Sequence, residues 1–187
     1  MKGKEMDYFA ALYDVTKVIN ASLEPARVLE EIVRCVTETM QVKACSLRLL
    51  DSREKKLELG AAFGLSDAYL HKGPIMVDES GLDQKALKGK TIWLKDAQTN
   101  RDFQYGDKAK AEGIKSVLVV PLMLDKKAVG VLRVYTGRVQ EFHDREVLFL
   151  EAVANLSAIA LDNARMHQTL LTRCDLMAAH KYRIDDN

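Results

Sequence analysis

Residues 113–142 constrain the fold of this chain more than any other stretch, because they read as two strands joined by a short charged turn. Residues 117–124 are β-branched or aliphatic apart from Pro121, and residues 129–135 alternate with Arg133 as their one charge. Such runs favour strands, and a proline inside one indicates a bulge or a sheet edge because it donates no ladder hydrogen bond. The stretch therefore predicts an antiparallel hairpin, and with it an α+β domain.

Hydrophobic periodicity predicts helices and further strands around this hairpin. A first helix is expected over residues 5–20, with a seam at spacings of three and four formed by Phe9, Leu12, Thr16 and Ile19. A second helix is expected over residues 23–40, with Ser22 as a good N-cap. The other expected elements are strands at 44–50, 56–63 and 91–94, an extended stretch at 74–77, and short helical segments at 67–71, 82–87 and 108–112.

The last helix is apolar nearly all round between Val147 and Leu161, where only Glu151, Asn155 and Ser157 are polar. A helix that packs on one sheet needs a single apolar stripe, so this helix has a second face to bury. Its continuation over residues 162–177 is more polar and is expected to project beyond the domain. We expect the terminal helices of two chains to form a bundle, and the protein to be a homodimer.

Composition argues against several classes of protein. The 187 residues include 28 Lys and Arg against 27 Asp and Glu, for a formal charge of +1, whereas a dedicated nucleic-acid binder would carry a basic excess. The three cysteines form no CxxC pair, so neither a zinc site nor a disulfide framework is indicated. The N-terminus has no apolar core of signal-peptide length, and the apolar run 152–161 is too short to span a bilayer. We expect a cytoplasmic protein that binds neither membrane nor nucleic acid.

Six segments, taken together and in order, resemble the GAF domain family over about residues 8–170. They are SLEPARVLEEIV from residue 22, GLSDAYLHKGPI from 64, ALKGKTIWLKDAQTNRDFQY from 86, AEGIKSVLVVPL from 111, AVGVLRVY from 128 and EFHDREVLFLEAVANLSAIALDNARMH from 141. The resemblance implies a central antiparallel sheet with the terminal helices packed on one face and a ligand pocket on the other. We divide the chain into a dimerisation helix at 1–21, a GAF-like domain at 22–162 and a projecting helix and tail at 163–187.

Members of this family bind small molecules in signalling proteins, and the ligand varies from one member to another. The stretch beginning at Asn100 lacks the lysine and the spaced Asp-Glu of the cyclic-nucleotide members. No cysteine lies between Ala61 and Asn163, which argues against a covalently held bilin. Free methionine sulfoxide reductases use a pocket cysteine, but Cys35 and Cys45 read as small buried hydrophobic residues. The resemblance therefore leaves the ligand unknown and names no cofactor, catalytic residue or metal site.

Candidate ligand contacts lie mainly in the loop between the short strand at 91–94 and the helical turn at 108–112. Its polar residues can anchor a small polar or zwitterionic metabolite, although Asp and Asn also form ordinary hydrogen-bonded turns. Two arginines can each clamp a carboxylate or phosphate, and two aromatic residues of the loop can form a lid. Trp93 is either a core residue or a stacking wall, and His71 is either a ligand contact or an exposed turn residue. The full candidate set is His71, Trp93, Asp96, Asn100, Arg101, Asp102, Phe103, Tyr105 and Arg133.

The leading hypothesis is a non-enzymatic GAF-type sensor that binds a small molecule and signals through a helical homodimer to a partner protein in trans. One alternative is a dimerisation or docking module whose pocket is filled by its own side chains, with Leu118, Val120, Met123 and Trp93 pointing inward. The other is a redox enzyme acting through Cys45 or Cys35, of the free methionine sulfoxide reductase type.

Overall fold

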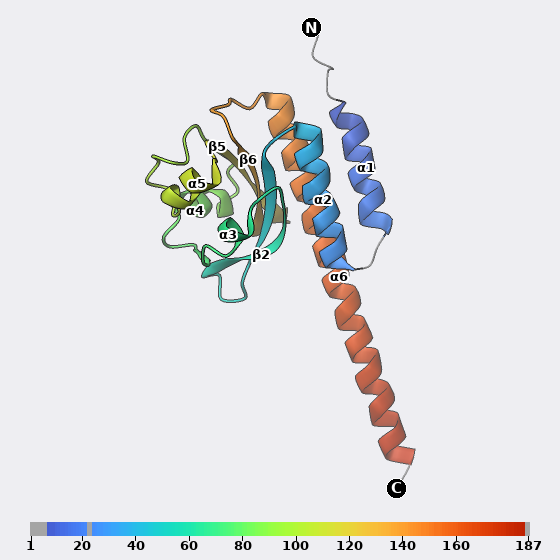
Figure 1. Cartoon of the computed structure of the whole chain (residues 1–187). Helices are drawn as coiled ribbons and strands as arrows, with labels where there is room; N and C mark the ends of the chain where they lie inside the picture. Colours follow the sequence, from blue (N-terminus) through green and yellow to red (C-terminus); the bar gives the residue numbers. More distant parts are fainter. Residues whose placement is uncertain (1–6, 22–23, 186–187) are drawn as a thin grey trace.

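A six-stranded antiparallel sheet forms the centre of the computed structural model, which describes residues 7–21 and 24–185 (Figure 1). The strand order is β3-β2-β1-β6-β5-β4. The bounds are β1 Ala44–Leu50, β2 Lys56–Phe63, β3 Ile75–Met76, β4 Ile92–Leu94, β5 Ser116–Leu124 and β6 Lys127–Thr136. The α+β class and the antiparallel sheet expected from the sequence are confirmed.

The β5–β6 hairpin forms where the sequence predicted it, and the position of Pro121 has a simple explanation. Pro121 pairs with Val131 of β6 on one side of β5. On the other side, the short strand β4 pairs only with Val117–Val119. Pro121 therefore lies on a stretch of β5 whose outer edge carries no strand, where its missing N–H leaves no ladder bond unmade.

Three helices cover one face of the sheet: α1 Tyr8–Ala21, α2 Pro25–Met40 and α6 Asp144–Asp185. Figure 1 shows α2 and the first half of α6 beside the sheet, α1 outside them, and the second half of α6 projecting alone. The first hydrophobic cluster lies in this layer, and its sheet members are Cys45, Leu47, Ala61, Leu118, Val120, Leu122, Leu132 and Val134.

Three short helices and their loops cover the opposite face: α3 Asp67–Leu70, α4 Gly81–Leu87 and α5 Gly106–Glu112. The second hydrophobic cluster lies between them and the sheet. Because successive strand residues point to opposite faces, β1, β5 and β6 each contribute alternate residues to the two clusters. Both faces of the central strands are therefore buried, and Ser46, Arg48 and Arg133 are not directed to solvent.

Two local expectations about the first helices are corrected by the structure. Phe9 is 82% exposed, whereas Leu12 and Ile19 of the expected seam do pack inward. The other inward-facing residues of α1 are Tyr8, Ala11, Val15 and Val18. The α2 helix begins at Pro25 with Glu24 at its N-cap, so it starts later than expected. Ser22, the N-cap inferred from the sequence, lies outside the described residues.

The α6 helix is more apolar than the sequence reading allowed. Over Asp144–Met177 it is long and apolar enough to cross a membrane, with a mean hydropathy of 1.4 in its best 18-residue window. About a third of that window is buried within the molecule, and a helix that packs on a protein core meets the same criteria. Leu150, Val153 and Ala154 are fully buried in the first hydrophobic cluster, which accounts for part of this apolar character.

Candidate functional site: a buried cationic cluster

The sheet face toward α3, α4 and α5 carries a row of polar side chains on its two central strands. Ser46 and Arg48 lie on β1, and Arg133 and Tyr135 lie on β6. The strand register pairs Ser46 with Arg133. The hydroxyl groups of Ser46 and Tyr135 are 2.9 Å apart and share a hydrogen bond. Each of these residues is at least 97% buried, so the four polar side chains form a row inside the protein.

Arg133 is neutralised by a carboxylate from the covering layer. Its Nη2 donates to Oδ2 of Asp83 on α4, and both side chains are buried. The hydroxyl of Ser80, the N-cap of α4, donates to the same oxygen at 2.6 Å. Burial alone would lower the pKa of Arg133, but the field and hydrogen bond of Asp83 raise it above its ordinary value. This ion pair ties α4 to the sheet.

Arg48 lies in the same layer and has no carboxylate of its own. Only 3% of the residue is exposed, and its Nη1 donates to the carbonyl of Leu57 at 3.4 Å. Its Nε and Nη2 atoms are buried and have no hydrogen-bond partner among the described residues. Burial lowers the pKa of Arg48 below its ordinary value, and the nearby charge of Arg133 lowers it further. A buried guanidinium with one unused edge is costly to maintain without a partner.

Tyr69 and Lys72 complete the cluster from the α3 side. The Tyr69 ring meets Tyr135 edge-on, with the ring centroids 6.2 Å apart, and Nζ of Lys72 lies 3.5 Å from the centroid of the Tyr69 ring. The Tyr69 hydroxyl and Nζ of Lys72 are both buried without a hydrogen-bond partner among the described residues. Burial, and then the charges of Arg48 and Arg133, lower the pKa of Lys72 from 10.5 to about 6.

The segment after α3 and the loop before α5 close over this cluster. The Tyr105 hydroxyl donates to the carbonyl of Pro74 at 2.7 Å, and its ring centroid lies 5.7 Å from Nζ of Lys72. Gly73 has a φ of +118°, and a Cβ there would lie 2.9 Å from the Tyr105 hydroxyl. Glycine is needed at this position for both reasons. Phe103, buried at 7% exposure, packs beneath in the second hydrophobic cluster.

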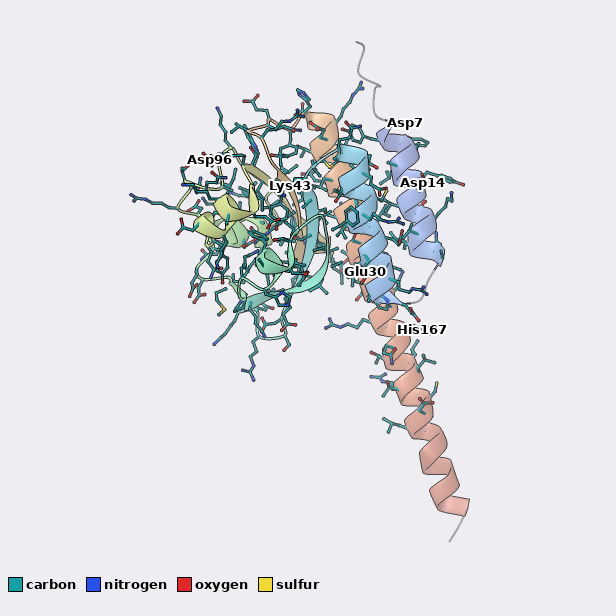
Figure 2. The ribbon with its side chains drawn as sticks, in the orientation of Figure 1. Asp7, Asp14, Glu30, Lys43, Asp96 and His167 are labelled. Atoms are coloured by element: carbon teal, nitrogen blue, oxygen red, sulfur yellow. The ribbon has the colours of Figure 1, made fainter. Side chains whose placement is uncertain are left out.

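The structure brings three of the sequence-derived candidates to this region and leaves the others outside it. Arg133, Phe103 and Tyr105 belong to the cluster or its cover. Most of the other candidates lie at exposed or half-buried turn positions, in the loop before α5 or at the C-cap of α3. They are His71, Asp96, Asn100, Arg101 and Asp102. Figure 2 labels Asp96 in the outer loop, far from the terminal helices.

Local hydrogen bonds explain most of these turn residues. Asp96 Oδ1 accepts from the backbone N–H of Gln98 at 2.9 Å, and Asn100 Oδ1 accepts from that of Asp102 at 2.8 Å. Asp102 also pairs with Lys85 of α4 at 2.5 Å. These contacts are the ordinary turn chemistry of Asp and Asn. They fix the loop that carries Phe103 and Tyr105.

Trp93 lies on the other side of the sheet from the cluster. It pairs with Leu118 of β5, so the two side chains share a face of the sheet. Leu118 belongs to the first hydrophobic cluster, on the face covered by α1, α2 and α6, which we call the helical-side cluster. With 38% of the residue exposed, Trp93 is not a core residue. Val120 belongs to the helical-side cluster with Leu118. Leu118, Val120 and Trp93, three of the four side chains proposed to fill the pocket, therefore do not point into it.

Sequence reasoning missed Arg48, Tyr69, Lys72 and Asp83. One signal was available, because Arg48 alternates with Leu47 and Leu49 on a strand that the hairpin pattern already made central. A charged residue on a central strand faces solvent only if that face is uncovered. Nothing local identified Asp83 as a partner, because it lies fifty positions before Arg133 and reaches it only through the packing of α4.

The cysteines lie away from the cluster. Cys45 is fully buried on the helical side of the sheet, and burial raises the pKa of its thiol far above its ordinary value. Cys35 is half-buried on α2, where burial also raises the pKa of its thiol. Cys174 is exposed on the projecting part of α6. Within residues 7–21 and 24–185, no group of three or more His, Cys, Asp and Glu side chains is placed to hold a metal ion.

Curated relatives of this chain are bacterial regulatory proteins. The formate hydrogenlyase transcriptional activator of Salmonella typhimurium (strain SL1344) is 23% identical over 172 residues, covering 89% of this chain and 25% of the relative. The Nif-specific regulatory protein of Herbaspirillum seropedicae is 28% identical over 152 residues, covering 78% of this chain and 28% of the relative. The chain thus spans about a quarter of the length of these relatives.

Solved structures share the fold. The GAF domain of a phosphoenolpyruvate-protein phosphotransferase from Coxiella burnetii superposes with a TM-score of 0.78 at 21% identity, covering 88% of this chain and 98% of that one. The free methionine-R-sulfoxide reductase of Neisseria meningitidis superposes with a TM-score of 0.72 at 20% identity, covering 86% and 91%. The family model described as GAF domain matches residues 22–162, well over half of the sequence. The chain belongs to the GAF domain family.

Proposed function

We propose that this chain is a non-enzymatic sensory domain that binds a small molecule between the sheet and the α3–α5 layer. The observation that carries the proposal is the buried polar cluster, in which Nε and Nη2 of Arg48, the Tyr69 hydroxyl and Nζ of Lys72 have no hydrogen-bond partner among the described residues. Buried polar groups without a hydrogen-bond partner are rare in folded proteins. A few convergent polar groups among apolar side chains are the usual form of a ligand site.

The sheet offers a short route from this site to the terminal helices. Arg133 and Tyr135 face the cluster, whereas their neighbours Leu132 and Val134 face α2 and α6 in the helical-side hydrophobic cluster. A ligand that shifts β6 by part of an ångström therefore changes the packing of both layers at once. Close-packed layers respond to such shifts by moving as units, which suits transmission to a helix.

The projecting part of α6 supports a homodimer as the output form. Its residues repeat at spacings of three and four in a heptad seam of Leu156, Ile159, Asn163, Met166, Leu170, Arg173 and Met177. The large apolar side chains of this seam from Ile159 onward are at least half exposed in the single chain. Apolar residues at these positions drive two-stranded coiled coils, and a single Asn in the seam fixes register. A second copy of this chain, aligned in parallel, covers the seam.

A groove beside the domain extends the same surface. It lies between α1 and α6, has a volume of ≈ 530 Å³, and includes Phe9 and Leu148 in its lining. These two side chains are 82% and 66% exposed. Continuity of this apolar surface with the α6 seam favours one interface that runs along both terminal helices.

The relatives support a role for this domain in a cytoplasmic regulator. Both are regulatory proteins about three to four times the length of this chain, and the match covers only a part of each. We infer that this domain supplies the sensing step and that a partner protein, or another part of a longer chain, supplies the response.

Native mass spectrometry of the protein purified under gentle conditions tests the sensor proposal. We expect a dimer that carries a reproducible additional mass, and we expect Arg48→Met to lose that mass while remaining a dimer. A bare dimer whose thermal stability is indifferent to every metabolite in a library supports the ligand-free docking module instead. A mass that persists in Arg48→Met places the ligand outside the cluster and contradicts the proposed site.

Light scattering with Leu170→Glu tests the dimer separately. Leu170 lies beyond the domain at a seam position, so a charge there separates the helices without disturbing the sheet. Gln168→Glu adds the same charge at an outward position of the same turn and serves as the control. A monomeric Leu170→Glu beside a dimeric Gln168→Glu is expected, and a dimer in both contradicts the coiled-coil interface.

A further inference from the structure

Apart from two atoms of the Arg133–Asp83 ion pair, the unpartnered atoms of the cluster can all donate a hydrogen bond. Six buried side-chain atoms lack a hydrogen-bond partner among the described residues. Two of them, Nε of Arg133 and Oδ1 of Asp83, belong to side chains that already share one charged hydrogen bond. They are a donor and an acceptor, the two groups that form the second arm of a bidentate contact between such side chains. The four that remain are Nε and Nη2 of Arg48, the Tyr69 hydroxyl and Nζ of Lys72, and all four can donate.

Arg48 presents these donors in a geometry that selects the acceptor. Its Nη1 is committed to the carbonyl of Leu57, which leaves the edge formed by Nε and Nη2. That edge carries two parallel N–H bonds, the arrangement that matches the two oxygens of a carboxylate or of a tetrahedral oxyanion. A neutral carbonyl group satisfies only one of them.

The net charge of the cluster also favours an anionic ligand. Arg48 and Arg133 are flanked by a single buried carboxylate, Asp83, which is already held by Arg133 and Ser80. The other carboxylate that acts on Lys72, Glu112, accepts from Ser66 and pairs with Lys43 at 3.7 Å, so its oxygens are already engaged. A buried excess of positive charge is unfavourable unless an anion balances it.

Packing limits the anion to a small one. Tyr69, Leu82, Val119, Val131 and Tyr135 surround the polar groups and are each at most 2% exposed. Tyr105 closes the outer side through its bond to the carbonyl of Pro74. A group that binds among these closely packed side chains must therefore be compact.

We propose that the cluster is a binding site for a small oxyanion, either a short carboxylate or inorganic phosphate, gripped by the Nε–Nη2 edge of Arg48 and by Lys72 and Tyr69. This inference rests on the proposed sensor function and adds the class of its ligand. Arg133 and Asp83 position the site by fixing α4 on the sheet, and Tyr105 with Gly73 and Pro74 forms the movable cover.

Ordered water is the competing explanation for the unpartnered donors, since a water molecule accepts two hydrogen bonds. The two explanations differ in charge, because water leaves the excess positive charge of the cluster unbalanced. Comparing each anion with a neutral molecule of the same shape therefore separates them.

The experiment measures thermal stability and calorimetric affinity of the full chain with formate, acetate, malonate and phosphate, at ionic strength matched with sodium chloride. Formamide, acetamide and malonamide are the neutral counterparts. We expect at least one anion to raise the melting temperature saturably and its amide to have no effect. Arg48→Met and Lys72→Met should each weaken binding by roughly 10- to 100-fold. Arg101→Met, which removes an exposed loop arginine, should leave it unchanged.

Each other outcome overturns part of the reasoning. Binding of an amide as tight as that of its anion, lost in Arg48→Met, keeps the sensor function and refutes the charge of the ligand. Anion binding that survives both Arg48→Met and Lys72→Met refutes the site. No anion-specific stabilisation by any of the four refutes the inference, while a bound mass lost in Arg48→Met by native mass spectrometry still preserves the sensor. If Arg48→Met fails to fold, Tyr69→Phe replaces it, because it removes one donor without changing a charge.

Discussion

Replacing Lys72 with methionine tests the electrostatics of the cluster directly. In the folded protein, burial and the charges of Arg48 and Arg133 lower the pKa of Lys72 from 10.5 to about 6. In the unfolded chain the lysine keeps its ordinary pKa. Between these two values the unfolded state holds one more proton than the folded state, so the free energy of unfolding rises with pH.

The expected magnitude follows from this proton difference. One bound proton corresponds to about 1.4 kcal/mol for each pH unit, or roughly 6 kcal/mol across the whole interval. Lys72→Met has no such proton and loses this dependence, and its side chain fills similar apolar space. We therefore expect the variant to be the more stable protein near neutral pH, with an advantage that shrinks by roughly 3 kcal/mol between about pH 7 and about pH 9.

The assay is urea unfolding of the wild type and of Lys72→Met at equal protein concentration across that pH range. Other titrating groups contribute equally to both proteins and cancel in the difference. The charged groups that act on the pKa of Lys72 are Arg48, Arg133, Asp83 and Glu112. The rings of Tyr69 and Tyr105 face its ammonium group. Lys88→Met, on an exposed lysine of the same charge, is the control and should show no pH-dependent difference.

A difference that stays constant with pH refutes the reasoning, because it means that Lys72 keeps its proton when folded. The same experiment with a saturating anion extends the test. An anion beside Nζ raises the pKa of Lys72 toward its ordinary value, so the pH dependence of the difference should become smaller. For the same reason the affinity for the anion should fall as pH rises above neutrality, with uptake of up to one proton on binding.

Three further outcomes are expected. Asp83→Asn should destabilise the protein by about 3–5 kcal/mol in urea unfolding, because it leaves the charge of Arg133 buried without a partner, and a loss below about 1 kcal/mol contradicts the importance of the pair. Tyr69→Phe should be as stable as the wild type or more stable by about 1 kcal/mol, since its hydroxyl has no partner to lose, and a clear destabilisation means that the hydroxyl is bonded. A thiol reagent should label Cys174 quickly and Cys45 only after unfolding, because burial raises the pKa of the Cys45 thiol; rapid labelling of Cys45 in the native protein revives the redox hypothesis.

Most of the fold was predictable because its signals are local. The β5–β6 hairpin was visible as two runs of strand-forming residues, and Pro121 marked the free edge of the sheet. The seam of α1 was misassigned at Phe9, because two apolar stripes on a short helix are equivalent until a neighbour packs against one of them. Only the positions of α2 and α6 decide that Tyr8 and Val15 turn inward.

The candidate site was predictable in part. Asp96 and Asn100 were selected as candidates because they are polar residues close together in one loop. In the structure their side chains accept hydrogen bonds from the backbone of that loop. Arg133 was identified from its isolated charge in an apolar strand. Its partner Asp83 sits on a short helix with the composition of any exposed helix, and no local pattern distinguishes a carboxylate that will be buried from one that will be solvated.

The sequence alone determined which elements form and which strand residues share a face, because side chains alternate along a strand with a period of two. That period placed Ser46 and Arg48 on one face of β1, and Cys45 and Leu47 on the other. The tertiary structure decided that the polar face is also covered, through the packing of α3, α4 and α5 on the sheet. Coverage comes from residues distant in the chain, and it turns an ordinary surface arginine into a buried charge with unused donors.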